Sequence, residues 1–320
     1  MTLLEVKNLK TYFYLDGKEY PAADDISFTL GKGKTIAIIG ESGSGKSVTA
    51  LSIMGLIDYP GRVIGGQVYY NGEDLLKKSE KEMRQIRGNE IAMIYQDPVS
   101  TLNPMNKVGE QIAESLIIHK KANRKESKNI AIELMKAVGI TDAEERFQHI
   151  PSQFSGGMSQ RIMIAMAIAC KPKILIADEP TTALDVTIQA EILDLLRSLK
   201  NEYNMSIILN THDLGVVAEM ADEVVVMYCG KIMEVAQNKE LFQNPINPYT
   251  KKLIECIPKI DDRKKRLDTI EGYVPHLSEL PKGCRFSDRC DKAFEKCKKE
   301  LPELREISKN HWSRCWLIKD

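Results

Sequence analysis

The segment GESGSGKS at residues 40–47 constrains the possible fold more than any other part of the chain. It follows TIAII, a β-branched run that predicts a buried strand, and it precedes SVTALSIMGLI, whose apolar spacing predicts a helix. Glycines in this order let backbone N–H groups turn toward an anion, and a helix beginning at Gly45 adds its positive end. Strand, loop and helix together indicate a P-loop that binds nucleotide phosphates.

The residue types of this loop suit ATP and Mg²⁺. Lys46 can reach the β- and γ-phosphates, and Ser47 can hold Mg²⁺. The candidate ATP-binding residues are Ser42, Gly43, Ser44, Gly45, Lys46, Ser47 and Val48. The alternative is a glycine-rich turn without a ligand, and the flanking strand and helix weigh against it.

A second apolar run, ILIADEP at residues 174–180, predicts a buried strand that ends in two acids. We expect Asp178 to bind the Mg²⁺ shell, and Glu179 to accept a proton from water attacking the γ-phosphate. An acidic strand end that merely caps a helix is the alternative. The P-loop in the same chain favours the catalytic interpretation.

Strands and helices alternate along the chain, with helical spacing over residues 107–170 and further strands at 205–213 and 223–230. This order predicts an α/β fold with a doubly wound, mostly parallel sheet. The longest apolar run, IMIAMAIAC at 162–170, is too short to span a bilayer. We expect a cytosolic protein with reduced thiols, and its net charge of +0 gives no indication of a nucleic-acid partner.

The segment FSGGMSQR at residues 154–161 opens a helix with a serine and two glycines, which predicts a second anion site. At this point the chain resembles the ATP-binding subunits of ABC transporters, whose usual signature begins LSGGQ. Phe154 stands for the leucine and Met158 for the glutamine. Ser155, Gly156 and Gly157 keep the family residues, so we expect this segment to contact the ATP of a partner subunit.

Further positions match the family in order. Gln96 matches the Q-loop, and the resemblance implies that it contacts Mg²⁺ and water and signals to the membrane partner. Asp185 in ALD matches the D-loop and would couple the two sites across the dimer. His212 in NTHD matches the switch histidine and would hold Glu179 and water in line with the γ-phosphate. Alone, each is more often a surface amide, an N-cap or a packed histidine, and only their joint order favours catalysis.

The adenine contact follows from the same register. Phe13 occupies the family position that stacks on the base. Tyr12 and Tyr14 flank it, so either remains an alternative.

Three other segments indicate which branch of the ABC transporter family the chain resembles. Residues 95–114, residues 244–258 and the segment GCRFSDRC resemble oligopeptide, dipeptide and nickel importers. FSGGMSQR is closer to the longer of their two ATPase subunits. The resemblance thus implies an ATPase subunit that powers peptide import, with nickel import as the alternative.

The end of the chain gathers four cysteines, namely Cys284, Cys290, Cys297 and Cys315. Their spacings are wider than the C-x2-4-C pairs of zinc ribbons. Relatives in this branch carry a [4Fe–4S] cluster here, so the resemblance implies one, and Arg285, Arg289 and Lys292 would favour thiolates. Zn²⁺, with His311 replacing one thiol, and reduced core cysteines are the alternatives.

The resemblance also implies the domain plan. We expect an ABC ATPase core of the P-loop NTPase class with an antiparallel β subdomain over residues 1–96 and 171–243. A helical signature subdomain would be inserted at 97–170. A small metal-stapled, cysteine-rich extension would cover 244–320.

The implied partners are those of an importer. They are a second ABC ATPase subunit (a paralogue or an identical chain), two polytopic permease subunits and, indirectly, an extracytoplasmic peptide-binding protein. The chain would then lie on the cytoplasmic face of the cell membrane as a peripheral subunit, with no nucleic acid bound.

Two other classes compete with this interpretation. A soluble ABC ATPase acting on DNA or ribosomes would carry long coiled coils or two cassettes, and the segment between Gln96 and Ser155 is too short for the former. An iron–sulfur redox sensor that only binds nucleotide would not need the intact Glu179 and His212.

Overall fold

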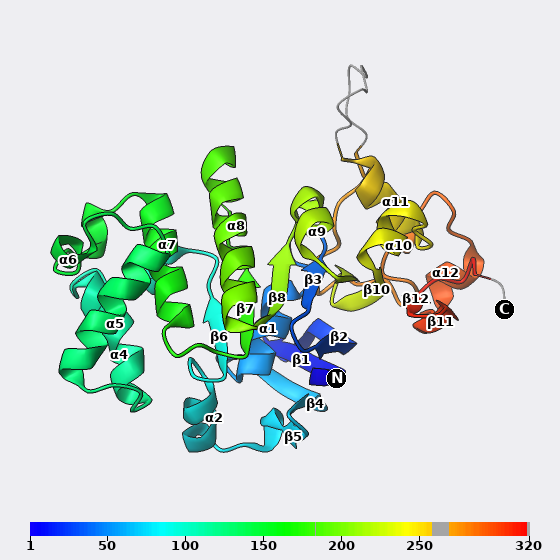
Figure 1. Cartoon of the computed structure of the whole chain (residues 1–320). Helices are drawn as coiled ribbons and strands as arrows, with labels where there is room; N and C mark the ends of the chain where they lie inside the picture. The colour runs from blue at the N-terminus through cyan, green and yellow to red at the C-terminus, as the bar shows by residue number, and fades with distance from the viewer. Residues whose placement is uncertain (183, 258–268, 319–320) are drawn as a thin grey trace. The chain divides into compact units, whose positions relative to one another are not determined.

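The computed structural model describes residues 1–182, 184–257 and 269–318, and these form two compact units (Figure 1). Unit 1 contains Met1–Leu30, Thr35–Leu76 and Asn210–Asp320, and unit 2 contains Gly31–Lys34 and Lys77–Leu209. Each unit is therefore assembled from segments that are distant in the sequence.

Unit 1 begins with two long strands, β1 (Thr2–Leu15) and β2 (Lys18–Gly31). The Asp16-Gly17 turn, with φ of 49° and 73°, joins these two strands directly. β4 (Gly61–Tyr70) and β5 (Glu73–Asp74) complete a sheet in the order β2-β1-β4-β5. β4 pairs antiparallel with β1 and with β5, and Phe13 lies opposite Gly61.

The second sheet region of unit 1 starts from β3 (Thr35–Ile39), which pairs parallel with β9 (Glu223–Tyr228). β10 (Lys231–Gln237), β12 (His311–Ser313) and β11 (Arg305–Ser308) follow outward in that order, each antiparallel to its neighbour. The C-terminal extension thus adds two strands to this sheet.

The helices of unit 1 are short. They are α1 (Lys46–Met54), α9 (Leu214–Met220), α10 (Asn238–Gln243), α11 (Pro248–Glu255), α12 (Glu295–Lys299) and the 3-10 turn η3 (Ser287–Arg289). Three buried aromatic residues, Tyr228 of β9 and Tyr249 and Phe286 of the extension, join the extension to β9. Their ring centroids lie 4.7, 5.1 and 5.4 Å apart, so the extension packs into the hydrophobic core of unit 1 rather than on its surface.

Unit 2 contains the parallel pair β6 (Ile91–Ile94) and β7 (Ile174–Asp178), and β8 (Ser206–Thr211, whose last two residues belong to unit 1) lies beside β7. Its helices and turns are η1 (Leu75–Lys77, shared with unit 1), α2 (Glu80–Ile86), α3 (Pro98–Thr101), α4 (Val108–Ile118), α5 (Arg124–Ala137), α6 (Ala143–Arg146), η2 (Pro151–Gln153), α7 (Gly156–Ile168) and α8 (Val186–Tyr203). α4 packs against α5 and α7. No helix among the described residues is long and apolar enough to cross a bilayer.

Candidate ATP-binding and catalytic site

The phosphate loop of unit 1 has the backbone that its glycines predict. β3 is buried along its whole length and is followed by Gly40, where φ is 153°, while Gly45 has φ 102°. A Cβ atom at Gly40 would lie 2.1 Å from the Met227 carbonyl oxygen, and one at Gly45 would lie 2.2 Å from that of Ala22. Only glycine fits these two positions, so backbone N–H groups can line the loop.

The side chains of the loop are arranged to receive an anion. Nζ of Lys46 donates to the carbonyl of Gly40 at 2.9 Å, and Lys46 is 5% exposed. Oγ of Ser44 is buried and has no hydrogen-bond partner among the described residues. A buried hydroxyl without a partner is costly, and a phosphate oxygen would satisfy it. Ser42 and Gly43 are exposed at the loop tip, and Ser47 and Val48 lie half-buried in the first turn of α1.

The three neighbouring aromatic residues on β1 differ in their contacts. The hydroxyl of Tyr12 donates to Asp24 at 3.1 Å, and burial together with that carboxylate raises the pKa of Tyr12 to about 12. The ring centroid of Tyr14 lies 5.9 Å from Cζ of Arg62. Phe13 is half-buried and faces Gly61, where an added Cβ would lie 2.8 Å from its ring. The two tyrosines are engaged within the chain, which favours Phe13 for stacking.

The acidic half of the site lies in unit 2. Asp178 ends β7 and is 4% exposed, and Glu179 follows with φ 48°. Oε2 of Glu179 accepts hydrogen bonds from Thr182 Oγ1 at 2.9 Å and from Gln96 Nε2 at 3.3 Å. A left-handed backbone is strained for glutamate and is often found at functional sites. The sequence did not single out Thr182, and its only signal was its place three residues after Glu179.

Gln96 itself lies beyond its strand. β6 ends at Ile94, and Gln96 is exposed in the following loop. The pairing of β6 with β7 brings Gln96 to Glu179 even so, because the two strands run parallel and end together.

The signature segment opens α7. Ser155 is its N-cap, and Oγ accepts a hydrogen bond from the Met158 backbone N–H at 3.4 Å. Ser155 and Gly156 are exposed, whereas a Cβ at Gly157 would lie 2.9 Å from Ile188 of α8. Sδ of Met158 lies 3.3 Å from Nη1 of Arg146. An exposed serine and N-terminal N–H groups at a helix end suit the binding of an anion from another molecule.

Two further candidates flank helices. Asp185 is the N-cap of α8, where Oδ1 accepts from the Ile188 N–H at 3.0 Å, and Ala183 of the ALD motif lies outside the described residues. His212 is exposed between β8 and α9.

The candidate site residues are divided between the two units. Unit 1 carries Phe13, the phosphate loop and His212, and unit 2 carries Gln96, Asp178, Glu179, the signature and Asp185.

The four cysteines of the extension line one cavity of about 20 Å³ in unit 1. The N–H of Cys284 donates to the carbonyl of Cys297 at 2.8 Å. Burial raises the pKa of Cys284 to about 11 and also raises the pKa values of Cys290 and Cys315, with further contributions from the neighbouring thiols. Without a cation the thiols of Cys284, Cys290 and Cys315 are therefore neutral at pH 7.

The side chains described in the extension do not form a recognisable metal site, although a metal was expected to stabilise this part of the chain. No group of three or more His, Cys, Asp or Glu among the described residues is arranged to hold a metal ion. His311, the alternative zinc ligand, is absent from the cavity lining, and its Nε2 lies 2.7 Å from Glu234. Of the three bases expected to favour thiolates, Lys292 lines the cavity, whereas Arg285 pairs with Asp24 at 3.6 Å and Arg289 with Glu41 at 2.9 Å.

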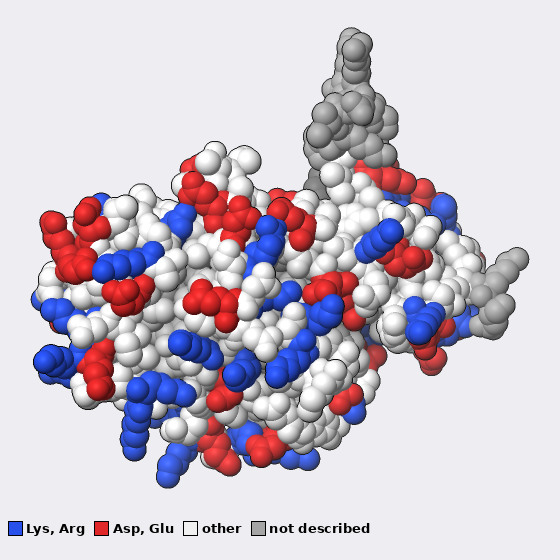
Figure 2. Space-filling model, viewed as in Figure 1, with Lys and Arg blue, Asp and Glu red and all other residues white. Residues whose placement is uncertain are grey.

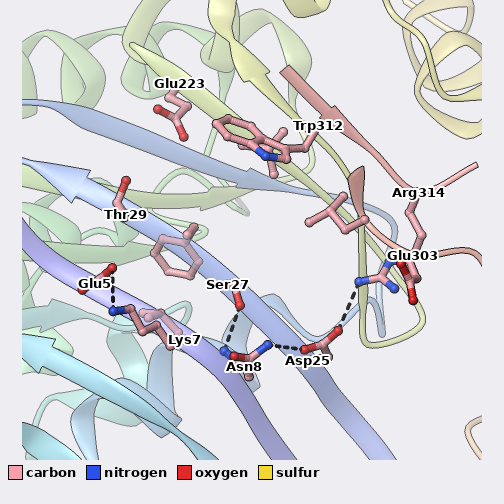
Figure 3. A pocket seen from close by; sticks show the side chains of 14 residues that line it. Glu5, Lys7, Asn8, Asp25, Ser27, Thr29, Glu223, Glu303, Trp312 and Arg314 are labelled. Atoms are coloured by element: carbon pink, nitrogen blue, oxygen red, sulfur yellow. Dashed lines mark hydrogen bonds and ion pairs between the residues drawn. The ribbon is translucent and has the colours of Figure 1, made fainter. Parts of the chain in front are cut away.

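The end of the extension also contacts the N-terminal strands. A cavity of about 620 Å³ lies between β1, β2 and the extension within unit 1 (Figure 3). Arg314 reaches Asp25 at 3.4 Å, and Asp25 accepts from Asn8 Nδ2 at 2.7 Å. Trp312 also lines this cavity, from β12. Polar contacts thus attach the extension to the same unit that holds the phosphate loop.

Comparisons with known proteins agree with these motifs. The ABC transporter family model matches residues 23–182, and the model of the oligopeptide/dipeptide transporter C-terminal region matches residues 233–297. The oligopeptide transport ATP-binding protein AppD of Bacillus subtilis is 49% identical over 320 residues, covering 100% of this chain and 98% of the relative. The dipeptide transport ATP-binding protein DppD of Escherichia coli is 47% identical over 98% of this chain and 96% of the relative.

A solved structure extends the comparison to the fold. The ATP-binding cassette MJ0796, in a dimeric post-hydrolysis state bound to ADP and Pi, is similar with a TM-score of 0.67 and 26% identity. The similarity covers 73% of this chain and 98% of that one. This chain therefore has the α/β ABC ATPase fold with a P-loop NTPase core, and it belongs to the family of ATP-binding proteins of oligopeptide and dipeptide ABC transporters.

Proposed function

We propose that this chain binds and hydrolyses ATP as the ATPase subunit of an ABC transporter and thereby powers the import of di- and oligopeptides. The observation that carries the proposal is the strained Glu179, which is held by Gln96 and Thr182, in a chain that also carries a formed phosphate loop. The match of residues 233–297 to the peptide-transporter C-terminal region supports the substrate class.

The roles of the site residues follow from their chemistry. Phe13 stacks on adenine, and the loop residues Ser42 to Val48 hold the phosphates, with Lys46 on the β- and γ-phosphates. Ser47, Gln96 and Asp178 would hold Mg²⁺, and the bound ion would neutralise charge on the phosphates. Hydroxyl, amide and carboxylate oxygens are ligands of the kind that hard cations such as Mg²⁺ prefer.

Hydrolysis is positioning plus one proton transfer. Glu179 accepts a proton from water as the water oxygen bonds to the γ-phosphorus and the bond from that phosphorus to the ADP oxygen breaks. His212 contacts the γ-phosphate and keeps the water in line. Thr182 and Gln96 fix the Glu179 carboxylate, so little reorganisation is needed at the moment of reaction.

The complete site requires two cassettes. Ser155, Gly156, Gly157 and Met158 of one cassette contact the ATP held by the P-loop of the other, and Asp185 couples the two sites. The exposed start of α7 supports this role, and the similar cassette MJ0796 is a dimer. The second cassette is a paralogue or an identical chain, and the pair acts on two permease subunits at the cytoplasmic face of the membrane. An extracytoplasmic peptide-binding protein then delivers the peptide.

We also propose that Cys284, Cys290, Cys297 and Cys315 hold a [4Fe–4S] cluster. Their shared cavity supports this proposal, because a cluster takes one cysteine on each iron and so needs four converging thiols. The cavity of about 20 Å³ must widen to admit it. Iron and acid-labile sulfide in anaerobically purified protein test the proposal, and one Zn²⁺ without sulfide would replace it with a structural zinc site.

A soluble ABC ATPase acting on nucleic acid or ribosomes is the second candidate, and the surface does not favour it. Figure 2 shows Lys and Arg interspersed with Asp and Glu over the face in view, whereas nucleic-acid binding uses a basic track. Nickel import stays the alternative within the importer branch. Co-purification with two polytopic membrane proteins, followed by peptide and nickel uptake assays, separates all three.

The direct test of the catalytic proposal is Glu179→Gln. The amide keeps the size of the side chain, and its oxygen can still accept from Thr182 and Gln96, but the amide cannot take a proton at neutral pH. We expect ATP binding to persist and turnover to fall by about 10²–10⁴. Near-normal hydrolysis would remove Glu179 as the base.

A further inference from the structure

We propose that Arg289 of the C-terminal extension is a positioning residue for the phosphate loop, which it serves by fixing Glu41 and neutralising its charge. Nη1 of Arg289 lies 2.9 and 3.0 Å from the two carboxylate oxygens of Glu41, 248 positions away in sequence. Both residues belong to unit 1.

Glu41 lies inside the loop that receives the phosphates. The neighbouring Gly40 has φ 153°. The carbonyl oxygen of Glu41 accepts hydrogen bonds from the Ser44 N–H at 3.1 Å and from Lys46 Nζ at 3.4 Å. Its own N–H donates to the Tyr249 hydroxyl at 3.2 Å. A movement of Glu41 would therefore move the groups that hold ATP.

The charge of Glu41 needs compensation. A carboxylate in a phosphate-binding loop repels a triphosphate, and the repulsion grows where protein excludes water. The Glu41 side chain is 27% exposed and that of Arg289 is 5% exposed, so the pair is screened less than a surface ion pair. The contact between Arg289 and Glu41 removes this repulsion before ATP arrives.

Arg289 can act in this way because its own position is fixed. Nε donates to the Glu271 carbonyl at 3.1 Å, and Nη2 donates to that of Ile270 at 3.2 Å. Nη1 also donates to the Tyr228 hydroxyl at 3.2 Å, and the guanidinium lies 6.0 Å from the Phe286 ring centroid. A guanidinium whose three nitrogens all donate hydrogen bonds holds a carboxylate in one geometry.

The extension therefore acts on ATP affinity as well as on stability. Arg289 ends η3, which begins right after the buried Phe286, so the fold of the extension sets where the guanidinium lies. Nucleotide binding should weaken when this contact is broken and recover when the uncompensated carboxylate is also removed.

The test is a double-mutant cycle on the full chain with Arg289→Gln, Glu41→Gln and the double variant. Affinity for a fluorescent ATP analogue and KM for ATP are measured alongside kcat and Tm. We expect Arg289→Gln to weaken ATP binding about tenfold, equivalent to about 1.4 kcal/mol, with kcat little changed. The double variant should bind ATP more tightly than Arg289→Gln, and Arg289→Lys should fall between Arg289→Gln and the wild type.

Arg314→Gln is the matched control, because Arg314 is a buried arginine of the same extension that pairs with Asp25 instead of the loop. We expect it to lower Tm without changing KM for ATP. The proposal is overturned if Arg289→Gln leaves ATP affinity unchanged, or if the double variant binds as weakly as Arg289→Gln. If Arg289→Gln does not fold, Arg289→Lys takes its place in the cycle. The double variant Glu41→Gln/Arg289→Lys should then bind ATP more tightly than Arg289→Lys, and equal affinity would overturn the proposal.

Discussion

The hydroxyl of Thr182 donates a 2.9 Å hydrogen bond to the Glu179 carboxylate, and the Thr182 N–H lies 3.2 Å from the Glu179 carbonyl. Both contacts hold a glutamate whose φ is 48°. Thr182 thus fixes the backbone turn and the orientation of the carboxylate together.

Thr182→Val should lower turnover without abolishing ATP binding. The substitution keeps the shape and removes a hydrogen bond of about 1 kcal/mol, which corresponds to about a fivefold loss in kcat. Steady-state hydrolysis checks the prediction. Thr182→Ser keeps the hydroxyl and should retain nearly full activity, so equal losses in both variants would assign the effect to packing.

Gly45→Ala should abolish ATP binding. The added Cβ would lie 2.2 Å from the Ala22 carbonyl oxygen at a position with φ 102°, so the loop must move. Binding of a fluorescent ATP analogue measures the loss.

Gly17→Ala is the control for this prediction. Gly17 also has positive φ, at 73°, but an added Cβ meets nothing within 4 Å. It should cost about 1–2 kcal/mol of stability from backbone strain and leave ATP affinity unchanged. Weakened ATP binding in Gly17→Ala would show that strain, rather than the steric clash, explains the Gly45 result.

The sequence predicted those parts of the site that depend on local chemistry. The loop glycines, the buried strand before Glu179 and the capping serine at Ser155 each follow from neighbours within a few residues. Contacts between residues that are distant in the sequence could not be predicted from such local patterns. Arg289 was expected near the thiols, but the packing of Phe286 turns it toward Glu41, and no local pattern encodes a contact across 248 positions.

Asp24→Asn should destabilise unit 1 by about 3–5 kcal/mol, because it leaves Lys231 buried without its partner. Oδ2 of Asp24 lies 2.9 Å from Nζ of Lys231, and their side chains are 13% and 6% exposed. Urea unfolding at pH 7 checks the loss. Lys299→Gln, which breaks the exposed pair with Glu295, is the control and should cost less than about 1 kcal/mol.

The pH dependence of the same pair has a definite sign. Burial pushes the pKa of Asp24 up, but Lys231, Tyr12 and Arg285 together outweigh burial, and the pKa falls below its ordinary value of 3.8. The unfolded state therefore binds the proton more tightly, and this stabilisation is present above about pH 4 and is lost as pH falls further. In Asp24→Asn the pKa of Lys231, already lowered by burial, should fall further. The variant should then regain stability as pH rises toward 10, whereas an unchanged deficit at pH 10 would contradict the role of Lys231.

Cys290→Ser should separate the two proposals made for the extension. Cys290 lines the thiol cavity and directly follows Arg289, so loss of a ligand there removes the cluster and loosens the residue that holds Glu41. We expect iron and sulfide to fall and ATP affinity to weaken in the same direction as in Arg289→Gln. Cys256→Ser changes a thiol that does not line this cavity and should alter neither quantity. Retained iron would exclude Cys290 as a ligand, and lost iron with unchanged ATP affinity would show that the Arg289 contact holds without the cluster.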